Sequence, residues 1–199
     1  MNEKIEKLKS EVIKASANID FVHHEWFVDL HLNIVEKIAL ELCERYPSAD
    51  RDLVLTLVWM HDYPKIIGGK MKEHDPIFTE NTIMTLLHQT GFDENFTKKV
   101  LGYQMIFESK MTEDLSKAPI EVQIASSADG ASHLFGPFFS IYWKENPNMT
   151  IPELMESNRN KLKKDWDRKI VLPEVKEALR GRHGIIFNQF AELPEKFLK

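Results

Sequence analysis

The sequence predicts an all-α fold with a buried metal site, and three features of the chain support this prediction. Apolar residues recur at spacings of three and four in every long periodic segment, and no segment shows the sustained alternation of a strand. Hydrophobic residues make up 43% of the chain, enough for a substantial core. Histidines and aspartates occupy inward positions of the predicted helices, where an unpaired polar side chain is costly.

The length of 199 residues favours a single domain, or one domain with an appendage. We expect one domain over residues 1–199, with its core at about 20–145 and a C-terminal helical extension at about 150–199.

The first two predicted helices each carry one apolar face. Residues 2–16 form a charged amphipathic helix that is expected to pack across the outside of the bundle, and its narrow stripe comprises Ile5, Leu8, Val12 and Ile13. The next helix carries a histidine on its apolar face, which comprises His31, Val35, Ile38, Ala39 and Leu42. The histidine is therefore expected to point into the core.

The third predicted helix is apolar along its length and ends in two adjacent metal-binding residue types. It starts near Ser48 or Asp50, either of which is a suitable N-cap. It ends at His61 and Asp62, and Pro64 then stops the helix or forces a turn. An imidazole and a carboxylate are thus presented together at the end of a buried helix.

The following segments alternate between loops and helices. Residues 67–76 contain two glycines and several charges, which predicts a loop. Residues 77–90 and 93–108 predict a helical hairpin about Gly91, and the polar residues 109–117 predict a further loop.

The C-terminal part of the chain is aromatic at first and then rich in lysine. Residues 135–143 are expected to form core or a subunit contact, so a homodimer is one option. From Ile151 onward we expect two helices divided at Leu172 and Pro173. The lysines of the first helix are expected to form a solvated face, and they include Lys161, Lys163 and Lys164.

The polar residues at inward positions predict one divalent metal site. His31, His61, Asp62 and Asp129 are the expected ligands, because two histidines and two carboxylates on separate helices can build such a site inside a bundle. For the His61–Asp62 pair alone, a capping histidine and an ordinary loop carboxylate would be the simpler interpretation. Nitrogen and oxygen donors suit Mn, Mg, Co, Ni, Zn or Fe without choosing among them.

The order and local context of these residues resemble the HD-domain superfamily of metal-dependent phosphohydrolases. "HLNIVEKIAL" with His31 is similar to the family's first-ligand helix. "WMHDYPKI" with His61, Asp62 and Lys65 is similar to its His-Asp-x-x-Lys turn, and "IASSADGASHL" with Asp129 to its last-ligand helix. The resemblance implies an HD-domain helical bundle with a divalent cation between the helices.

The resemblance covers roughly residues 20–135, and the sequence departs from part of the family. Dinuclear relatives take two extra histidines from the hairpin, whereas the hairpin here contains only His88. This difference favours a site for a single metal ion. His-Asp-x-x-Glu-Asp, the text of the family's ppGpp hydrolases, is also absent.

The chemistry expected of this ligand set is hydrolysis of a phosphate ester. Two histidines and two carboxylates leave open positions on a six-coordinate ion for water and a phosphate oxygen. Asp62, or a nearby acid, is expected to orient the water as a general base. Lys65 either stabilises charge on the phosphate or pairs with a carboxylate.

His24, Lys65 and His74 are the candidates for contacts with a substrate. At most one of the adjacent His23 and His24 can face the site, and helical phase with His31 favours His24. Surface positions for both histidines are an equally good interpretation. His74, in the loop after the metal ligands, is a second candidate beside Lys65. His133 is expected to support the site from outside the ligand set.

Composition limits the class of partner. The formal net charge of −5 disfavours nucleic acid as a ligand but permits a small phosphorylated substrate. Cys43 is the only cysteine, which rules out an intramolecular disulfide. A charged N-terminus without an apolar leader and the lack of a membrane-spanning run predict a cytoplasmic protein.

Three classes of function are compatible with these observations. The expected one is a metal-dependent phosphohydrolase acting on a small phosphate ester, such as a nucleoside monophosphate. A non-haem iron oxygenase of the HD fold is an alternative, disfavoured by the missing histidines. A non-catalytic metal- or nucleotide-binding regulatory module is another, disfavoured because all four expected ligands are present.

Overall fold

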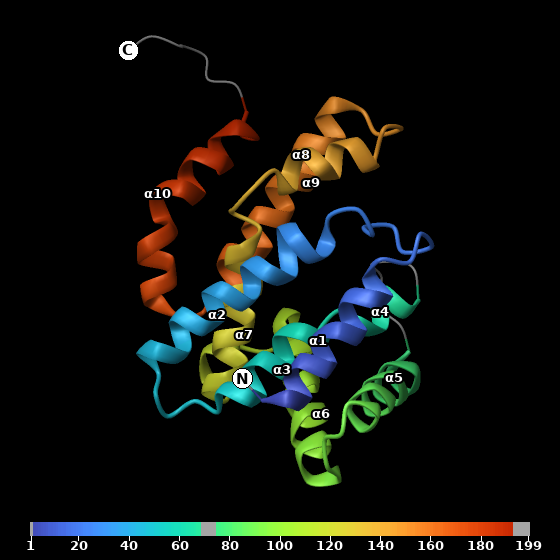
Figure 1. Cartoon of the computed structure of the whole chain (residues 1–199). Coiled ribbons are helices and arrows are strands. Elements are labelled where there is room, and N and C mark those ends of the chain that lie inside the picture. Colours follow the sequence, from blue (N-terminus) through green and yellow to red (C-terminus); the bar gives the residue numbers. More distant parts are fainter. Residues whose placement is uncertain (1, 69–74, 193–199) are drawn as a thin grey trace.

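The computed structural model describes residues 2–68 and 75–192, and the regular elements in these ranges are helices without any strand (Figure 1). The predicted all-α class is thus confirmed. The α-helices are α1 (Glu3–Ser16), α2 (Asn33–Arg45), α3 (Arg51–Met60), α4 (Tyr63–Ile67), α5 (Pro76–Gln89), α6 (Glu94–Glu108), α7 (Ile120–Ser132), α8 (Phe138–Glu145), α9 (Ile151–Lys164) and α10 (Pro173–Gln189). Two π-helical turns, η1 (Val28–Leu32) and η4 (Asp165–Lys169), precede α2 and follow α9.

Helices α2, α3 and α7 pack against one another at the centre of the fold (Figure 1). Every residue of α3 from Leu53 to Met60 is buried. Every residue of α7 from Glu121 to Ser132 is buried except Gln123, and many of the side chains are small. Small side chains allow neighbouring backbones to approach closely, so α7 brings its own polar groups near those of α2 and α3.

Helix α1 covers part of this centre and packs against α3, α4 and α5. Ile5, Leu8 and Val12 of its predicted stripe are fully buried. Ile13 is 42% exposed, because it lies about 100° around the helix from Val12 and so faces away from α3. The stripe is therefore narrower than predicted, and its buried part contributes to the core.

The predicted break after the third helix is confirmed, and it positions two candidate ligands. The Asp50 side chain caps α3 by accepting a hydrogen bond from the Leu53 amide. Helix α3 ends at Met60, and α4 starts at Tyr63, after two intervening residues, with Pro64 in its first turn, where the missing N–H costs nothing. His61 and Asp62 form the junction between the two helices.

The segment after α4 was predicted as a loop, and most of it, including His74, lies outside the described residues. The predicted hairpin is confirmed as α5 and α6, and Gly91 between them has φ +91°. The predicted division of the C-terminal segment is also confirmed, since η4 ends at Lys169 and α10 begins at Pro173.

The segment expected to be a C-terminal extension packs directly on the central helix, because η4 contacts α7. A Cβ atom added to Gly130 of α7 would lie 2.8 Å from Cβ of Lys169. Glycine at position 130 therefore permits the close approach of η4, which places the side chains of Asp165 and Lys169 beside the candidate site.

Candidate metal centre

His31 reaches the centre of the bundle from the π-helical turn η1 and is 2% exposed. Its Nδ1 lies 3.0 Å from Oγ of Ser132, whose single hydroxyl proton is donated to the Asp129 carbonyl. Nδ1 must therefore carry the imidazole proton and donate it to Ser132. This leaves the Nε2 lone pair free, 3.8 Å from both Asp62 Oδ2 and Asp129 Oδ1.

His61 is oriented in the same way by the end of α3. Its Nδ1–H donates to the Val58 carbonyl at 2.7 Å, which leaves a lone pair on Nε2. This Nε2 is buried and makes no hydrogen bond within the part of the chain that the structure describes. It lies 3.2 Å from Asp62 Oδ2 and 4.0 Å from Asp129 Oδ1. A buried lone pair without a donor is costly unless a cation occupies the position in front of it.

The two aspartates use one oxygen each for a lysine and turn the other toward the histidines. Asp62 Oδ1 accepts from Lys65 Nζ at 2.8 Å, and Asp129 Oδ2 accepts from Lys169 Nζ at 2.6 Å. Asp62 Oδ2 and Asp129 Oδ1 are the oxygens nearest to His61. Each lysine therefore holds its aspartate in a fixed orientation while one oxygen remains available.

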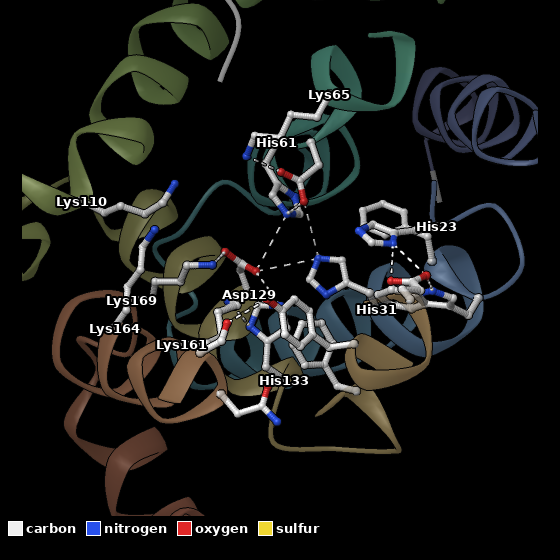
Figure 2. Close-up of a pocket in the computed structure, with 18 residues that line it drawn as sticks. His23, His31, His61, Lys65, Lys110, Asp129, His133, Lys161, Lys164 and Lys169 are labelled. Carbon is white, nitrogen blue, oxygen red and sulfur yellow. Dashed lines mark hydrogen bonds and ion pairs between the residues drawn. The ribbon is translucent and has the colours of Figure 1, made fainter. Parts of the chain in front are cut away.

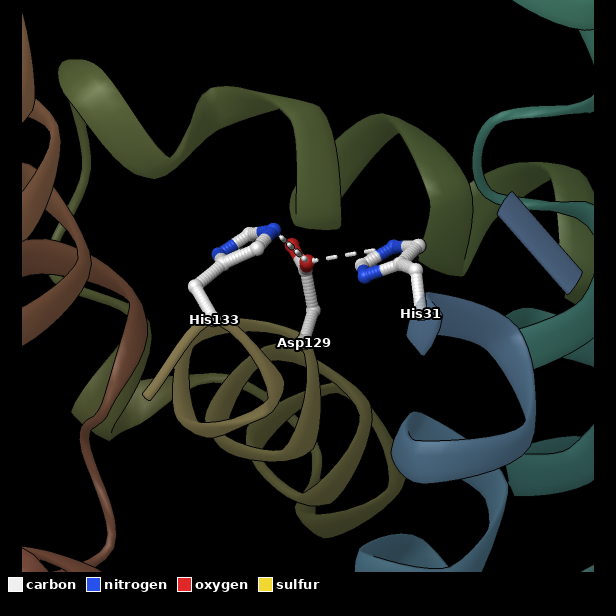
Figure 3. Close-up of side chains that lie close together, drawn as sticks. All are labelled: His31, Asp129 and His133. Atoms are coloured by element: carbon white, nitrogen blue, oxygen red, sulfur yellow. Dashed lines mark ion pairs between the residues drawn. The ribbon is translucent and has the colours of Figure 1, made fainter. Parts of the chain in front are cut away.

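His133, which was predicted only to support the site, lies within it (Figure 3). Its ring stacks on that of His31 with centroids 5.0 Å apart, and its Nε2 lies 3.9 Å from Asp129 Oδ1. Nδ1 lies 2.9 Å from Asp165 Oδ2 and 3.1 Å from Lys161 Nζ. We assign the proton to Nδ1, because two lone pairs would repel at the distance from Asp165. Nε2 then faces the centre unprotonated.

The protonation states of these groups suit metal binding. Burial, followed by the positive charges of neighbouring groups, lowers the pKa of His31 well below its usual value and also lowers the pKa of His133. Burial opposes the ionised form of Asp62 and Asp129, but the adjacent lysine and the neighbouring histidines together outweigh it and hold both pKa values well below the usual range. Neutral imidazole and ionised carboxylate are the forms that bind metal ions.

His61 differs from the other two histidines. Burial opposes its charged form, but the Asp62 and Asp129 carboxylates outweigh burial and raise the pKa of His61. In the absence of a cation the proton on Nε2 would partly neutralise the two aspartates. A divalent cation in the same place would displace that proton.

The donor set fits a divalent ion. Two overlapping groups, His31–His61–Asp62 and His31–Asp129–His133, each have all their ligand atoms within 4.8 Å of one another. The atoms are imidazole nitrogens and carboxylate oxygens, which suit the first-row divalent metals. These buried side chains could therefore hold a metal ion, and the four predicted ligands all lie among them.

A cavity of about 300 Å³ opens beside these groups. Its lining includes five lysines, at positions 65, 110, 161, 164 and 169. Figure 2 shows Lys110, Lys164 and Lys169 on one side of the centre and His23 on the opposite side. Near His23 the wall is aromatic, and the ring of Trp26 is tilted by 50° relative to the His23 ring, with centroids 4.8 Å apart.

The structure places His23, rather than the favoured His24, on the cavity wall. His23 contacts Glu145 at 2.9 Å, and the Trp26 indole donates to the same carboxylate at 2.6 Å. His24 Nδ1 instead lies 2.9 Å from the Phe21 carbonyl. The helical phase of His31 does not extend back to His24, because residues 22–26 form turns and a π-helical turn follows them.

Lys161, Lys163 and His88 differ in their exposure to solvent. Lys161 does not belong to a solvated face: it contacts Asp165 at 2.8 Å and lines the cavity, because η4 folds back beside α9. Lys163 is exposed, as expected. The side chain of His88, the only histidine of the predicted hairpin, is 44% exposed and lies beside Glu94.

Within the described residues, none of the helices is long and apolar enough to cross a membrane. The chain matches no protein-family model, and no curated protein and no solved structure shows significant similarity to it. The functional interpretation therefore rests on the geometry of the site and on the motifs of the sequence.

Proposed function

We propose that the protein is a metal-dependent phosphohydrolase of the HD-domain type that acts on a small phosphate ester. The observation that carries this proposal is the convergence of nitrogen and oxygen donor atoms from His31, His61, Asp62 and Asp129 on the wall of a lysine-rich cavity. The strongest single indication of a cation site is the buried Nε2 of His61, which faces two carboxylate oxygens and makes no hydrogen bond to any of the described residues.

A bound divalent ion would supply Lewis acidity and would lower the pKa of an attached water. The chain itself supplies orientation and charge. Asp62 lines the cavity, and its Oδ2, which Lys65 does not use, is an acceptor for a proton of the attacking water, while Lys65 helps to keep the carboxylate ionised and in place. Lys65 Nζ lines the same cavity, so its remaining N–H groups can donate to phosphate oxygens.

The walls of the cavity indicate the kind of substrate. Its volume suits a small molecule and excludes a folded nucleic acid. The lysines favour an anion, and the aromatic side chains of Trp26 and Phe138 favour a ring. A nucleoside monophosphate combines both features and is the first candidate.

The test is phosphate release from a panel of nucleotides and generic esters. Protein loaded with Mn, Mg, Co, Ni, Zn or Fe would be compared with chelator-treated protein, and metal content would be measured by elemental analysis. We expect turnover only with metal, at one ion per chain. Asp62→Ala should remove both metal and turnover, whereas the matched control His88→Ala should keep both, because His88 lies on the surface.

Two outcomes would contradict the proposal. Metal-loaded protein that releases no phosphate from any ester would favour the regulatory binding module. Two irons per chain together with substrate-dependent oxygen uptake would favour the oxygenase.

A further inference from the structure

Lys164 differs from the other four lysines on the cavity wall. It is half-buried, and it forms no hydrogen bond or ion pair with any residue in the ranges 2–68 and 75–192. Each of the other four has a carboxylate partner, and the pairs are Lys65–Asp62, Lys110–Glu108, Lys161–Asp165 and Lys169–Asp129. Among the described residues, Lys164 is therefore the cavity lysine without a direct carboxylate partner, and only the more distant charge of Asp165 partly offsets its own.

The surroundings of Lys164 add to this positive charge. Burial, followed by the charges of Lys169 and Lys110, lowers the pKa of Lys164. Lys110 is only 7% exposed, and its ammonium lies 4.7 Å from the centroid of the Phe107 ring. Like charges gathered in a partly buried site repel one another unless an anion lies between them. This arrangement is unfavourable for the empty protein and favourable for a complex with an anion.

Lys164 and Lys110 lie on one particular side of the metal centre. They lie on the side of the centre opposite to His23 (Figure 2). A phosphoryl group at the centre, with an organic ring toward His23 and Trp26, would not need these two lysines. They are placed to meet a second group that extends from the centre in the other direction.

We propose that Lys164 and Lys110 form a second anion subsite, which takes a further phosphoryl group of the ligand. The inference rests on the proposed function, since that places the first phosphoryl group at the metal centre. The ligand class is then an ester with two phosphoryl groups, such as a nucleoside diphosphate. Ammonium groups bind phosphate as point charges, and each lysine here retains N–H donors for phosphate oxygens.

Binding of two phosphate probes to the metal-loaded protein tests this subsite without requiring turnover. The probes are inorganic phosphate and methylenediphosphonate, which carries two phosphonyl groups and is not hydrolysed. Their dissociation constants would be measured by calorimetry for the unaltered protein, Lys164→Met and Lys164→Arg. The matched control is Lys163→Met, because Lys163 is the neighbouring residue and is exposed.

We expect the diphosphonate to bind more tightly than phosphate, and Lys164→Met to reduce that preference about tenfold, as for loss of one charge-assisted hydrogen bond. Lys163→Met and Lys164→Arg should retain the preference. An equal preference in Lys164→Met and Lys163→Met would overturn the inference.

The inference and the proposed function fail in different ways. A preference that depends on Lys164, in protein that hydrolyses no ester, would support the subsite and contradict the phosphohydrolase. Turnover of monophosphates alone, with a preference that Lys164→Met does not change, would contradict the subsite and leave the phosphohydrolase standing.

Discussion

The two aspartates of the candidate centre are held by lysines in two different ways. Asp62 pairs with Lys65, three residues along the chain, and the side chains of Lys65 and Asp62 are 21% and 9% exposed. Asp129 pairs with Lys169, forty residues along the chain, and the two side chains are only 9% and 4% exposed. The first pair is formed within one helical turn, whereas the second exists only when η4 packs on α7.

The two pairs contribute differently to the stability of the site. The lysine of the local pair is partly hydrated. If that lysine is removed, water and the neighbouring His61 can still stabilise the charge on Asp62. The distant pair is buried and belongs to a larger group of charges, since Lys169 also lies 3.4 Å from Asp165. Breaking a buried pair leaves an uncompensated charge, which costs more than the pair contributes.

The largest effect is expected from Lys169→Met, which would leave the Asp129 carboxylate buried without its partner. The free energy of unfolding should fall by about 3–5 kcal/mol. Urea denaturation followed by circular dichroism measures this change. Lys163→Met serves as the control, and a loss below about 1 kcal/mol in Lys169→Met would show that water replaces the lysine.

A smaller effect is expected from Gly130→Ala, which acts on the same pair through the backbone. The added methyl group would meet Lys169 Cβ at 2.8 Å and Ile170 Cγ1 at 3.0 Å. Pushing η4 away from α7 should cost about 1–3 kcal/mol of stability and should weaken metal binding. The control Gly102→Ala should be neutral or stabilising, since a Cβ there meets nothing within 4 Å. Equal effects of the two substitutions would contradict the close packing.

Lys65→Met should affect stability less than Lys169→Met, by about 1 kcal/mol, because Lys65 is partly hydrated. Its effect on phosphate turnover should exceed its effect on metal content, because its ammonium lines the cavity. Parallel measurements of unfolding, metal content and turnover would separate these effects. Stability losses as large as those of Lys169→Met would remove the distinction between the two pairs.

The smallest expected effect is a difference in pH dependence between His61 and His133, measured on chelator-treated protein. The pKa of His61 is raised in the folded protein. Its contribution to the free energy of unfolding is therefore present below about pH 6.5 and is lost as pH rises through the folded-state value. The pKa of His133 is lowered, so its contribution is present above about pH 6.5 and is lost as pH falls.

His61→Gln should therefore cost more stability at about pH 5.5 than at about pH 8.5, and His133→Gln should show the reverse. Each trend is limited to about 1.4 kcal/mol per pH unit. Urea denaturation at the two pH values measures both. Parallel trends in the two variants would show that the charges on the two sides of the centre do not differ in this way.

Local patterns in the sequence were sufficient to predict the helices and several residues of the candidate centre. The break at His61 and Asp62 was predictable because an apolar helix ends there before Pro64, and the inward position of His31 because it continues the apolar face of α2. Asp129 was predictable as a carboxylate among small and apolar residues. Such signals extend over one or two helical turns, which a sequence displays directly.

The surroundings of these residues depend on contacts between distant segments of the chain. His23 rather than His24 lines the cavity, because a π-helical turn before α2 changes the helical phase between these residues and His31. His133 joined the centre because Asp165 fixes its ring, although its spacing of four residues from Asp129 was a signal in the sequence. Lys164, Lys110 and Lys169 meet at one cavity only because η4 folds onto α7. Contacts between distant segments leave no periodic pattern, so their physical origin is the packing of the whole chain.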